Sequence, residues 1–189
     1  IEDEKISFAG SSSELKKFLS ISRSEKYEII DGRNKVIMPG FIDSHTHFVF
    51  AGSRENEYEM RLAGSTYQDI AKAGGGILST VQTVRKTPKS ILKQEAEDRL
   101  KKFVMNGTTT LEGKSGYGLD LGSEVKTLEV MNELNRENKY GLDIVPTFLG
   151  AHSVPPEKTK EEYVQEICHS LIPVISKEKL AVFIDVFIE

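Results

Sequence analysis

The sequence predicts an α/β fold whose strands run parallel. From residue 36 onward, short β-branched segments alternate with longer segments in which apolar residues recur with a helical period. Parallel strands need a crossover of a dozen or more residues between them, and each interval between consecutive strand-like segments here is long enough to provide one. We therefore expect a parallel sheet covered by helices, preceded by a smaller unit in residues 1–38.

The smaller unit reads as a piece of β-structure with one helix. Residues 5–10 (KISFAG) and 27–31 (YEIID) have the composition of short strands, and the second is followed by the turn residues DGRN. Between them, three serines at 11–13 offer an N-cap for the helical segment ELKKFL. Pro39 and Gly40 then form a turn that separates this unit from the next extended segment.

The larger unit predicts four strands joined by helices. The amphipathic segment 90–105 ends at Asn106-Gly107, a pair typical of a helix C-terminus. The triple glycine at 74–76 lacks the spacing of a phosphate loop, so we interpret it as a plain loop or as backbone that approaches a ligand. The predicted strands are 41–48, 108–112, 142–149 and 181–188, and the predicted helical segments are 55–62, 65–70, 90–105, 123–135 and 161–175.

Two of the four histidines lie one residue apart at the end of the first strand, in the segment PGFIDSHTH. Side chains alternate along a strand, so His45 and His47 point to the same face, and Asp43 shares that parity. Two imidazoles on one face can together hold one divalent ion, at about 2.0–2.1 Å from each nitrogen. The alternative is that each is a hydrogen-bonded histidine of the core.

Polar side chains follow three of the predicted strands. His45 and His47 end the first, Lys114 to Tyr117 follow the second, and His152 follows the third. The carboxyl ends of parallel strands meet at one edge of a sheet, so we expect these side chains at one rim. His169 lies within a predicted amphipathic helix, and we assign it no functional role.

The composition excludes several classes of protein. The net charge is -4 and the basic residues are interspersed with acidic ones, which argues against a nucleic-acid partner. No apolar segment reaches the roughly 18 residues that a membrane span requires, and no signal peptide begins the chain. A single cysteine, Cys168, suits a reducing compartment, so we expect a cytoplasmic protein that acts on a small molecule.

The motifs also resemble a known family. PGFIDSHTH resembles the signature of the amidohydrolase superfamily, and AGSRENEYEMRLAGSTYQDI, AGGGILSTV, KSGYGLDL and FLGAHSVPPE follow in the order found in the imidazolonepropionase family. The resemblance implies that residues 39–189 form about the first four units of a (β/α)₈ barrel of the TIM type, and that residues 1–38 are part of a small β-sandwich. It also implies metal-dependent hydrolysis of 4-imidazolone-5-propanoate to N-formimidoyl-L-glutamate in histidine degradation, with zinc or iron, and a possible homodimer at full length.

The resemblance assigns roles to five residues. His45 and His47 match metal ligands, while Arg54 and Tyr117 match substrate-binding residues. His152 matches a catalytic histidine that contacts the substrate and can stabilise charge on the carbonyl oxygen. Without the resemblance, a solvated loop arginine, a packed surface tyrosine and a hydrogen-bonded loop histidine remain the alternatives. Tyr67 is a weaker candidate for lining the pocket.

The length of the chain limits what it can do alone. A complete (β/α)₈ barrel has about 250 residues, and the chain has 189. The family's remaining metal ligands, a histidine and an aspartate, and its acidic general base come from later strands that this sequence does not contain. We therefore expect an N-terminal fragment that is inactive by itself. Two alternatives stay open, namely another amidohydrolase acting on a ring amide or amidine, such as a deaminase, and a non-catalytic scaffold domain.

Overall fold

A computed structural model describes residue 1, residues 5–21 and residues 27–188. The chain divides into two compact units, residues 1–39 and residues 40–189. The two units are described separately.

The first unit contains one helix, α1 (Ser12–Ile21). Ser11 caps it, because its backbone N–H donates to Glu14 Oε2 at 2.8 Å and its Oγ accepts from Glu14 N at 3.4 Å. The expected strands at 5–10 and 27–31 are not formed among the described residues: Lys5 forms an isolated bridge, and residues 27–31 form no ladder. A strand needs a neighbour for its backbone hydrogen bonds. The described residues of this unit provide no such neighbour, and no β-sandwich is seen there.

The second unit is built on a four-stranded sheet in the order β1-β2-β3-β4. All three neighbouring pairs are parallel, which confirms the predicted order and direction. The strands are β1 (Phe41–Thr46), β2 (Thr108–Lys114), β3 (Asp143–Ala151) and β4 (Phe183–Val186). The first and last strands are shorter than the predicted 41–48 and 181–188, and the pairing of β1 with β2 is irregular between Asp43 and Thr46.

Helices connect the strands. Between β1 and β2 lie α2 (Glu55–Leu62), α3 (Tyr67–Lys72), α4 (Ile77–Lys86) and α5 (Lys89–Met105). The next crossover is α6 (Leu121–Glu137), and the last is α7 (Lys160–Glu166), the π-helical turn η1 (Ile167–Leu171) and α8 (Ile172–Lys177). The segment 161–175 was predicted as one helix, and the π-helical turn interrupts it. His169 lies in that turn and is exposed.

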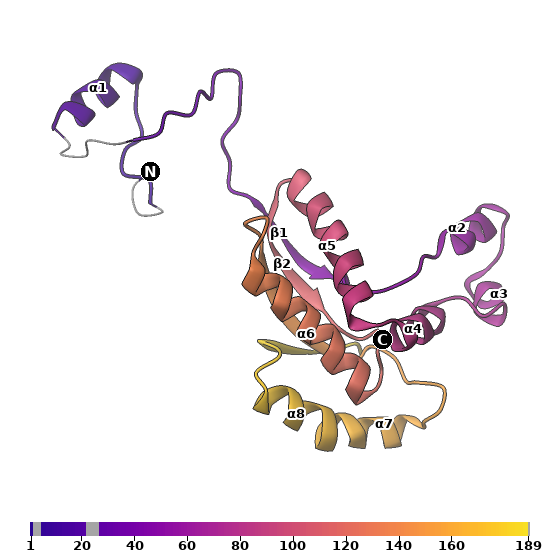
Figure 1. Cartoon of the computed structure of the whole chain (residues 1–189). Helices are drawn as coiled ribbons and strands as arrows, with labels where there is room; N and C mark the ends of the chain where they lie inside the picture. Colours follow the sequence, from indigo (N-terminus) through magenta and orange to yellow (C-terminus); the bar gives the residue numbers. More distant parts are fainter. Residues whose placement is uncertain (2–4, 22–26, 189) are drawn as a thin grey trace. The chain divides into compact units, whose positions relative to one another are not determined.

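The core lies between the sheet and the helices that cover one of its faces, as Figure 1 shows for α5 and α6. Leu92, Ala96 and Leu100 follow one another at one-turn spacing along α5, and all three are buried. Leu111 of β2 and Phe148 of β3 pack into the same core from the sheet. The alternation along β2 therefore directs Leu111 to the helices and its neighbours Glu112 and Thr110 to the opposite face.

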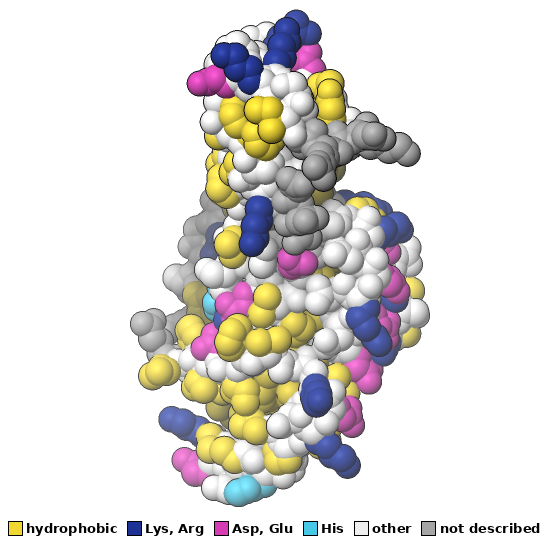
Figure 2. Space-filling view, turned by 90° about the vertical axis from the view of Figure 1, so that its left-hand side faces the viewer, with side chains coloured by type: hydrophobic (Ala, Val, Ile, Leu, Met, Phe, Trp, Pro, Cys, Tyr) yellow, Lys and Arg dark blue, Asp and Glu magenta, His cyan; other side chains and the backbone are white. Residues whose placement is uncertain are grey.

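The opposite face of the sheet is open, and large apolar side chains are exposed at its edge. Phe183, Ile184 and Val186 of β4 are each more than half exposed. In the lower half of Figure 2, hydrophobic side chains, drawn in yellow, gather on the surface with few charged side chains between them. The sheet curls as the first half of a (β/α)₈ barrel does. In the part of the chain that is described, no helix is both long and apolar enough to span a bilayer.

Candidate functional site

The two histidines of the HTH motif lie at the carboxyl end of β1. His45 is the penultimate residue of the strand, and His47 comes directly after it. Their ring centroids are 5.5 Å apart. Asp43 has turned to the backbone, where its Oδ1 accepts a hydrogen bond from His45 N at 3.1 Å. The strand is thus too short to hold both histidines, but their rings still lie side by side.

His47 is enclosed and His45 is exposed. The Nδ1 atom of His47 is buried and has no hydrogen-bond partner among the described residues. Burial, together with the nearby His152, His45 and Lys114 side chains, lowers the pKa of His47 to about 3, and only the backbone of Lys114 acts in the opposite direction. His47 is therefore a neutral imidazole at pH 7, which is the form that binds metal ions.

Two other aromatic side chains surround His47. The His152 ring stacks on it with a centroid distance of 4.6 Å and an interplanar angle of 10°. The Tyr117 ring lies at the same centroid distance, tilted by 31°. Tyr117 and His152 are 5.4 Å apart, so the three rings form one cluster above the ends of β1, β2 and β3.

The position of Tyr117 depends on a tightly held loop between β2 and α6. Glu124 of α6 is fully buried, and its carboxylate accepts hydrogen bonds from the backbone N–H groups of Gly116, Gly118 and Leu119 at 3.0, 2.7 and 3.0 Å. Burial raises the pKa of Glu124, and the Ser115 side chain and the backbone donors oppose that shift. One acidic side chain thus fixes the backbone on both sides of Tyr117.

Gly116 is required for the approach of the two loops. Its φ is +104°, and a Cβ atom there would lie 2.5 Å from the carbonyl oxygen of Leu149 and 2.9 Å from His152 Cβ. The carbonyl oxygen of Gly116 lies 3.1 Å from Nδ1 of His152. Because a carbonyl oxygen only accepts hydrogen bonds, His152 donates from Nδ1, and its Nε2 is left for other partners.

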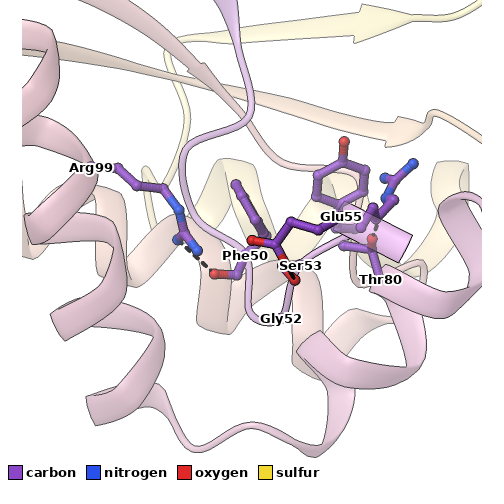
Figure 3. Close-up of a pocket in the computed structure, with 8 residues that line it drawn as sticks. Phe50, Gly52, Ser53, Glu55, Thr80 and Arg99 are labelled. Atoms are coloured by element: carbon purple, nitrogen blue, oxygen red, sulfur yellow. Dashed lines mark hydrogen bonds between the residues drawn. The ribbon is translucent and has the colours of Figure 1, made fainter. Parts of the chain in front are cut away.

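Arg54 reaches the cluster from the segment that follows β1. Its guanidinium carbon lies 5.8 Å from the centre of the Tyr117 ring. Arg54 also lines a pocket of about 410 Å³. Figure 3 shows Phe50, Gly52, Ser53 and Glu55 on one chain segment around this pocket, with Thr80 and Arg99 contributed by other elements. The remaining lining residue is Tyr117, so the pocket adjoins the aromatic cluster.

A second polar group lies on the open face of the sheet. Lys114, at the end of β2, is 4 % exposed, and its Nζ lies 2.6 Å from Glu112 Oε1 and 2.9 Å from Asp185 Oδ2. Thr147 of β3 donates to the same Glu112 oxygen at 2.6 Å. These contacts connect β2, β3 and β4 across the face that the helices leave open.

The structure brings together the five residues to which the sequence assigned roles: His45, His47, Arg54, Tyr117 and His152. Tyr67 is exposed in α3 and does not line the pocket. Sequence reasoning missed Glu124, Thr80 and Arg99. An acidic residue in the first turn of a helix and an arginine within an amphipathic helix are both ordinary, so neither carried a signal.

The histidine pair fits two positions of a metal site. Two imidazoles that share one ion at about 2.0–2.1 Å have ring centres roughly 5 Å apart, close to the observed 5.5 Å. The unpartnered, buried Nδ1 atom and the neutral state of His47 agree with this use. Within the described residues no group of three or more acidic, histidine or cysteine side chains could hold a metal ion, so this part of the chain contributes the histidine pair alone.

Comparison with known proteins agrees with the motifs. No protein-family model matches the chain. It is 45% identical to the imidazolonepropionase of Shouchella clausii, over all of this chain and 42% of that protein. It is 47% identical to the enzyme of that name from Geobacillus kaustophilus, over 88% of this chain and 39% of the relative. It is 48% identical to the imidazolonepropionase of Bacteroides fragilis, over 84% of this chain and 39% of that protein.

The chain is related to the imidazolonepropionases over their N-terminal part. It spans about two-fifths of the length of these relatives. All of the motifs at the carboxyl ends of β1, β2 and β3 lie within the stretch that matches the Shouchella clausii imidazolonepropionase.

Proposed function

We propose that the chain forms the N-terminal share of an imidazolonepropionase active site, which hydrolyses 4-imidazolone-5-propanoate to N-formimidoyl-L-glutamate in histidine degradation. The observation that carries the proposal is the convergence of two histidines, a tyrosine, a third histidine and an arginine at one end of a parallel sheet. A common rim is where enzymes of this architecture hold their catalytic groups. The names of the three relatives favour this chemistry over that of a deaminase or a scaffold domain.

In this proposal His45 and His47 hold one zinc or iron ion together with ligands from outside the chain. The ion, when bound, supplies Lewis-acid activation of water and of the lactam carbonyl. Enclosure of His47 by Tyr117 and His152 keeps its imidazole neutral and restricts its rotation. His45 is exposed and lacks a comparable enclosure.

Arg54, Tyr117 and His152 bind the substrate in this proposal. The guanidinium group of Arg54 offers two parallel donors to the propionate carboxylate. The hydroxyl of Tyr117, on a loop held by Glu124, bonds the ring or the carboxylate. His152 donates from Nδ1 to the carbonyl oxygen of Gly116. In the neutral imidazole, Nε2 can then accept a hydrogen bond from an N–H of the substrate ring. Donation from Nε2 to the carbonyl oxygen of the substrate requires the protonated imidazolium form.

We also propose that residues 39–189 are the first half of a (β/α)₈ barrel and that residues 1–38 belong to a small β-sandwich domain. The parallel order of β1 to β4 supports the barrel. For the sandwich, the support is the strand-like composition of residues 27–31, which would form a ladder only with a partner strand.

A chimeric enzyme tests the proposed function. Residues 1–189 of this chain replace the matching stretch of the Shouchella clausii imidazolonepropionase, and ring opening is followed by loss of the imidazolone absorbance. We expect zinc- or iron-dependent turnover that His45→Ala and His47→Ala abolish. The unmodified relative is the positive control, and far-UV circular dichroism checks folding. A folded chimera that binds metal but leaves the ring intact would refute the proposal.

A further inference from the structure

Arg54 is held by a side chain to which nothing so far assigns a role. Its Nε–H donates to Oγ1 of Thr80 at 2.9 Å. Thr80 lies in the first turns of α4 and is only 6 % exposed, so its hydroxyl is buried in the wall of the pocket. The helix begins after Gly76, whose φ of +79° lets the chain turn sharply into it.

The two arginines of the pocket differ in how many of their donors the protein uses. The guanidinium group of Arg99 donates to the carbonyl oxygens of Phe48 and Phe50 at 3.2 and 2.7 Å and to the Glu95 carboxylate at 3.1 Å. It also lies 3.6 Å above the Phe50 ring. Arg99 is therefore committed to holding the segment after β1, and Figure 3 shows its bond to the Phe50 carbonyl.

Arg54 has its terminal nitrogens available. Within the described part of the chain, the bond from Nε–H to Thr80 is the hydrogen bond that the Arg54 side chain makes, and the guanidinium group forms no ion pair. The guanidinium carbon lies 5.8 Å from the Tyr117 ring centre. A guanidinium group can receive a carboxylate either side-on, through Nε and one terminal nitrogen, or end-on, through both terminal nitrogens. Thr80 occupies Nε, so the end-on approach remains.

We propose that Thr80 is a positioning residue for the carboxylate of the substrate: by accepting the Nε–H of Arg54, its hydroxyl aims the two terminal nitrogens into the pocket. The inference rests on the proposed function and extends it. Thr80 touches Arg54 and acts through it. A threonine is suited to this position because the short, branched side chain has few rotamers and the hydroxyl accepts at a fixed place.

The kinetic test uses the chimeric enzyme and two substrates, the propionate and its uncharged methyl ester. Thr80→Val removes the acceptor with little change of volume. We expect KM for the propionate to rise about tenfold while kcat changes less than about twofold, because an arginine free to rotate binds the carboxylate less well. KM for the ester should stay unchanged. Thr80→Ser, which keeps the hydroxyl, should restore KM for the propionate.

Thr83→Val is the matched control for α4. Thr83 lies one turn further along the same helix, and its hydroxyl donates to the carbonyl oxygen of Ser79 at 3.0 Å, outside the pocket. It should leave the KM of both substrates unchanged. A Thr80→Val enzyme whose KM is unchanged, or rises equally for propionate and ester, overturns the inference while the proposed function stands.

A spectroscopic measurement on the chain itself separates the two proposals. In protein labelled with ¹⁵N-arginine, the Nε–H signal of Arg54, assigned by its loss in Arg54→Lys, should be protected from exchange with water. Thr80→Val should remove that protection and Thr80→Ser should keep it. Unprotected Nε–H in the unmodified chain overturns the contact. If a folded, metal-binding chimera proves inactive, the proposed function fails, and this measurement still decides whether Thr80 holds Arg54.

Discussion

Replacing Glu124 tests whether one buried carboxylate holds the loop that carries Tyr117. In Glu124→Gln the amide oxygen can keep the place of Oε1, which accepts from Gly118 and Leu119 at 2.7 and 3.0 Å. The NH₂ group then stands where Oε2 accepts from Gly116 at 3.0 Å, so a donor faces a donor and the Gly116 N–H keeps only its longer contact with Oε1, at 3.2 Å. Loss of the shorter bond should cost about 1–2 kcal/mol, less than a fully unsatisfied buried donor.

Glu124→Ala removes the acceptor for all three N–H groups and should cost more. Three unsatisfied donors correspond to roughly 3–9 kcal/mol, and the lower end applies if water enters the space. The matched control is Glu129→Gln on the same helix, where a partly exposed ion pair with Lys89 is lost. That control should cost about 1 kcal/mol or less.

Urea unfolding followed by far-UV circular dichroism measures these differences in the free energy of unfolding, from the shift of the urea midpoint when the dependence on urea concentration is unchanged. Amide hydrogen exchange at Gly116 and Gly118 reports the loop directly. Gly116 should exchange faster in Glu124→Gln, and both residues should remain protected in Glu129→Gln. The reasoning fails if the two variants unfold at the same urea concentration and the loop amides keep their protection in both.

Three further predictions concern other parts of the chain. In urea unfolding, Gly116→Ala should lower the free energy of unfolding by at least about 2 kcal/mol more than Gly141→Ala does. Both glycines have positive φ, but only at Gly116 would a Cβ atom lie within 3 Å of a neighbour, Leu149 O. Equal losses in the two variants would contradict this reasoning. Ion pairs with two lysines of α5 lower the pKa of Glu133 in α6, so the carboxylate stabilises the fold above its unfolded pKa of 4.5 and loses that effect as the pH falls through its lower folded pKa. Glu133→Gln should therefore reduce the difference between the free energies of unfolding measured at pH 7 and at acidic pH. An unchanged difference would exclude this contribution. The open edge of β4 predicts concentration-dependent self-association in sedimentation, which Phe183→Lys should reduce, and a chain that stays monomeric at every concentration would refute that role for the edge.

The parallel sheet was predictable because each strand is short, β-branched and separated from the next by a helix long enough to cross over. Helix α5 illustrates this: its apolar residues recur at one-turn intervals, and the same residues Leu92, Ala96 and Leu100 are buried. Residues 27–31 have a similar local pattern but no ladder. A strand is stabilised by its neighbour, and the identity of that neighbour is not contained in five residues.

The candidate site was predictable where chemistry leaves a mark on the sequence. Two histidines one residue apart, and a glycine on either side of Tyr117, are uncommon patterns with a physical reason. Glu124 and Thr80 left no such mark, because their importance comes from burial and from partners 5 to 26 positions away. Burial of a polar side chain is a property of the packed molecule, and residue type alone does not report it.

The structure also separates the parts of the candidate site by how firmly this chain holds them. Tyr117 and His152 are fixed by Glu124, by Gly116 and by the stacking of His152 on His47, all of which are contacts inside the second unit. His45 lies on β1, an edge strand with irregular pairing, and its side chain is exposed. An edge strand gains order when a further strand pairs with it. It follows that the proposed substrate-binding side of the site is preorganised in this chain, and we expect the proposed metal-binding side to become ordered when a second strand pairs with β1.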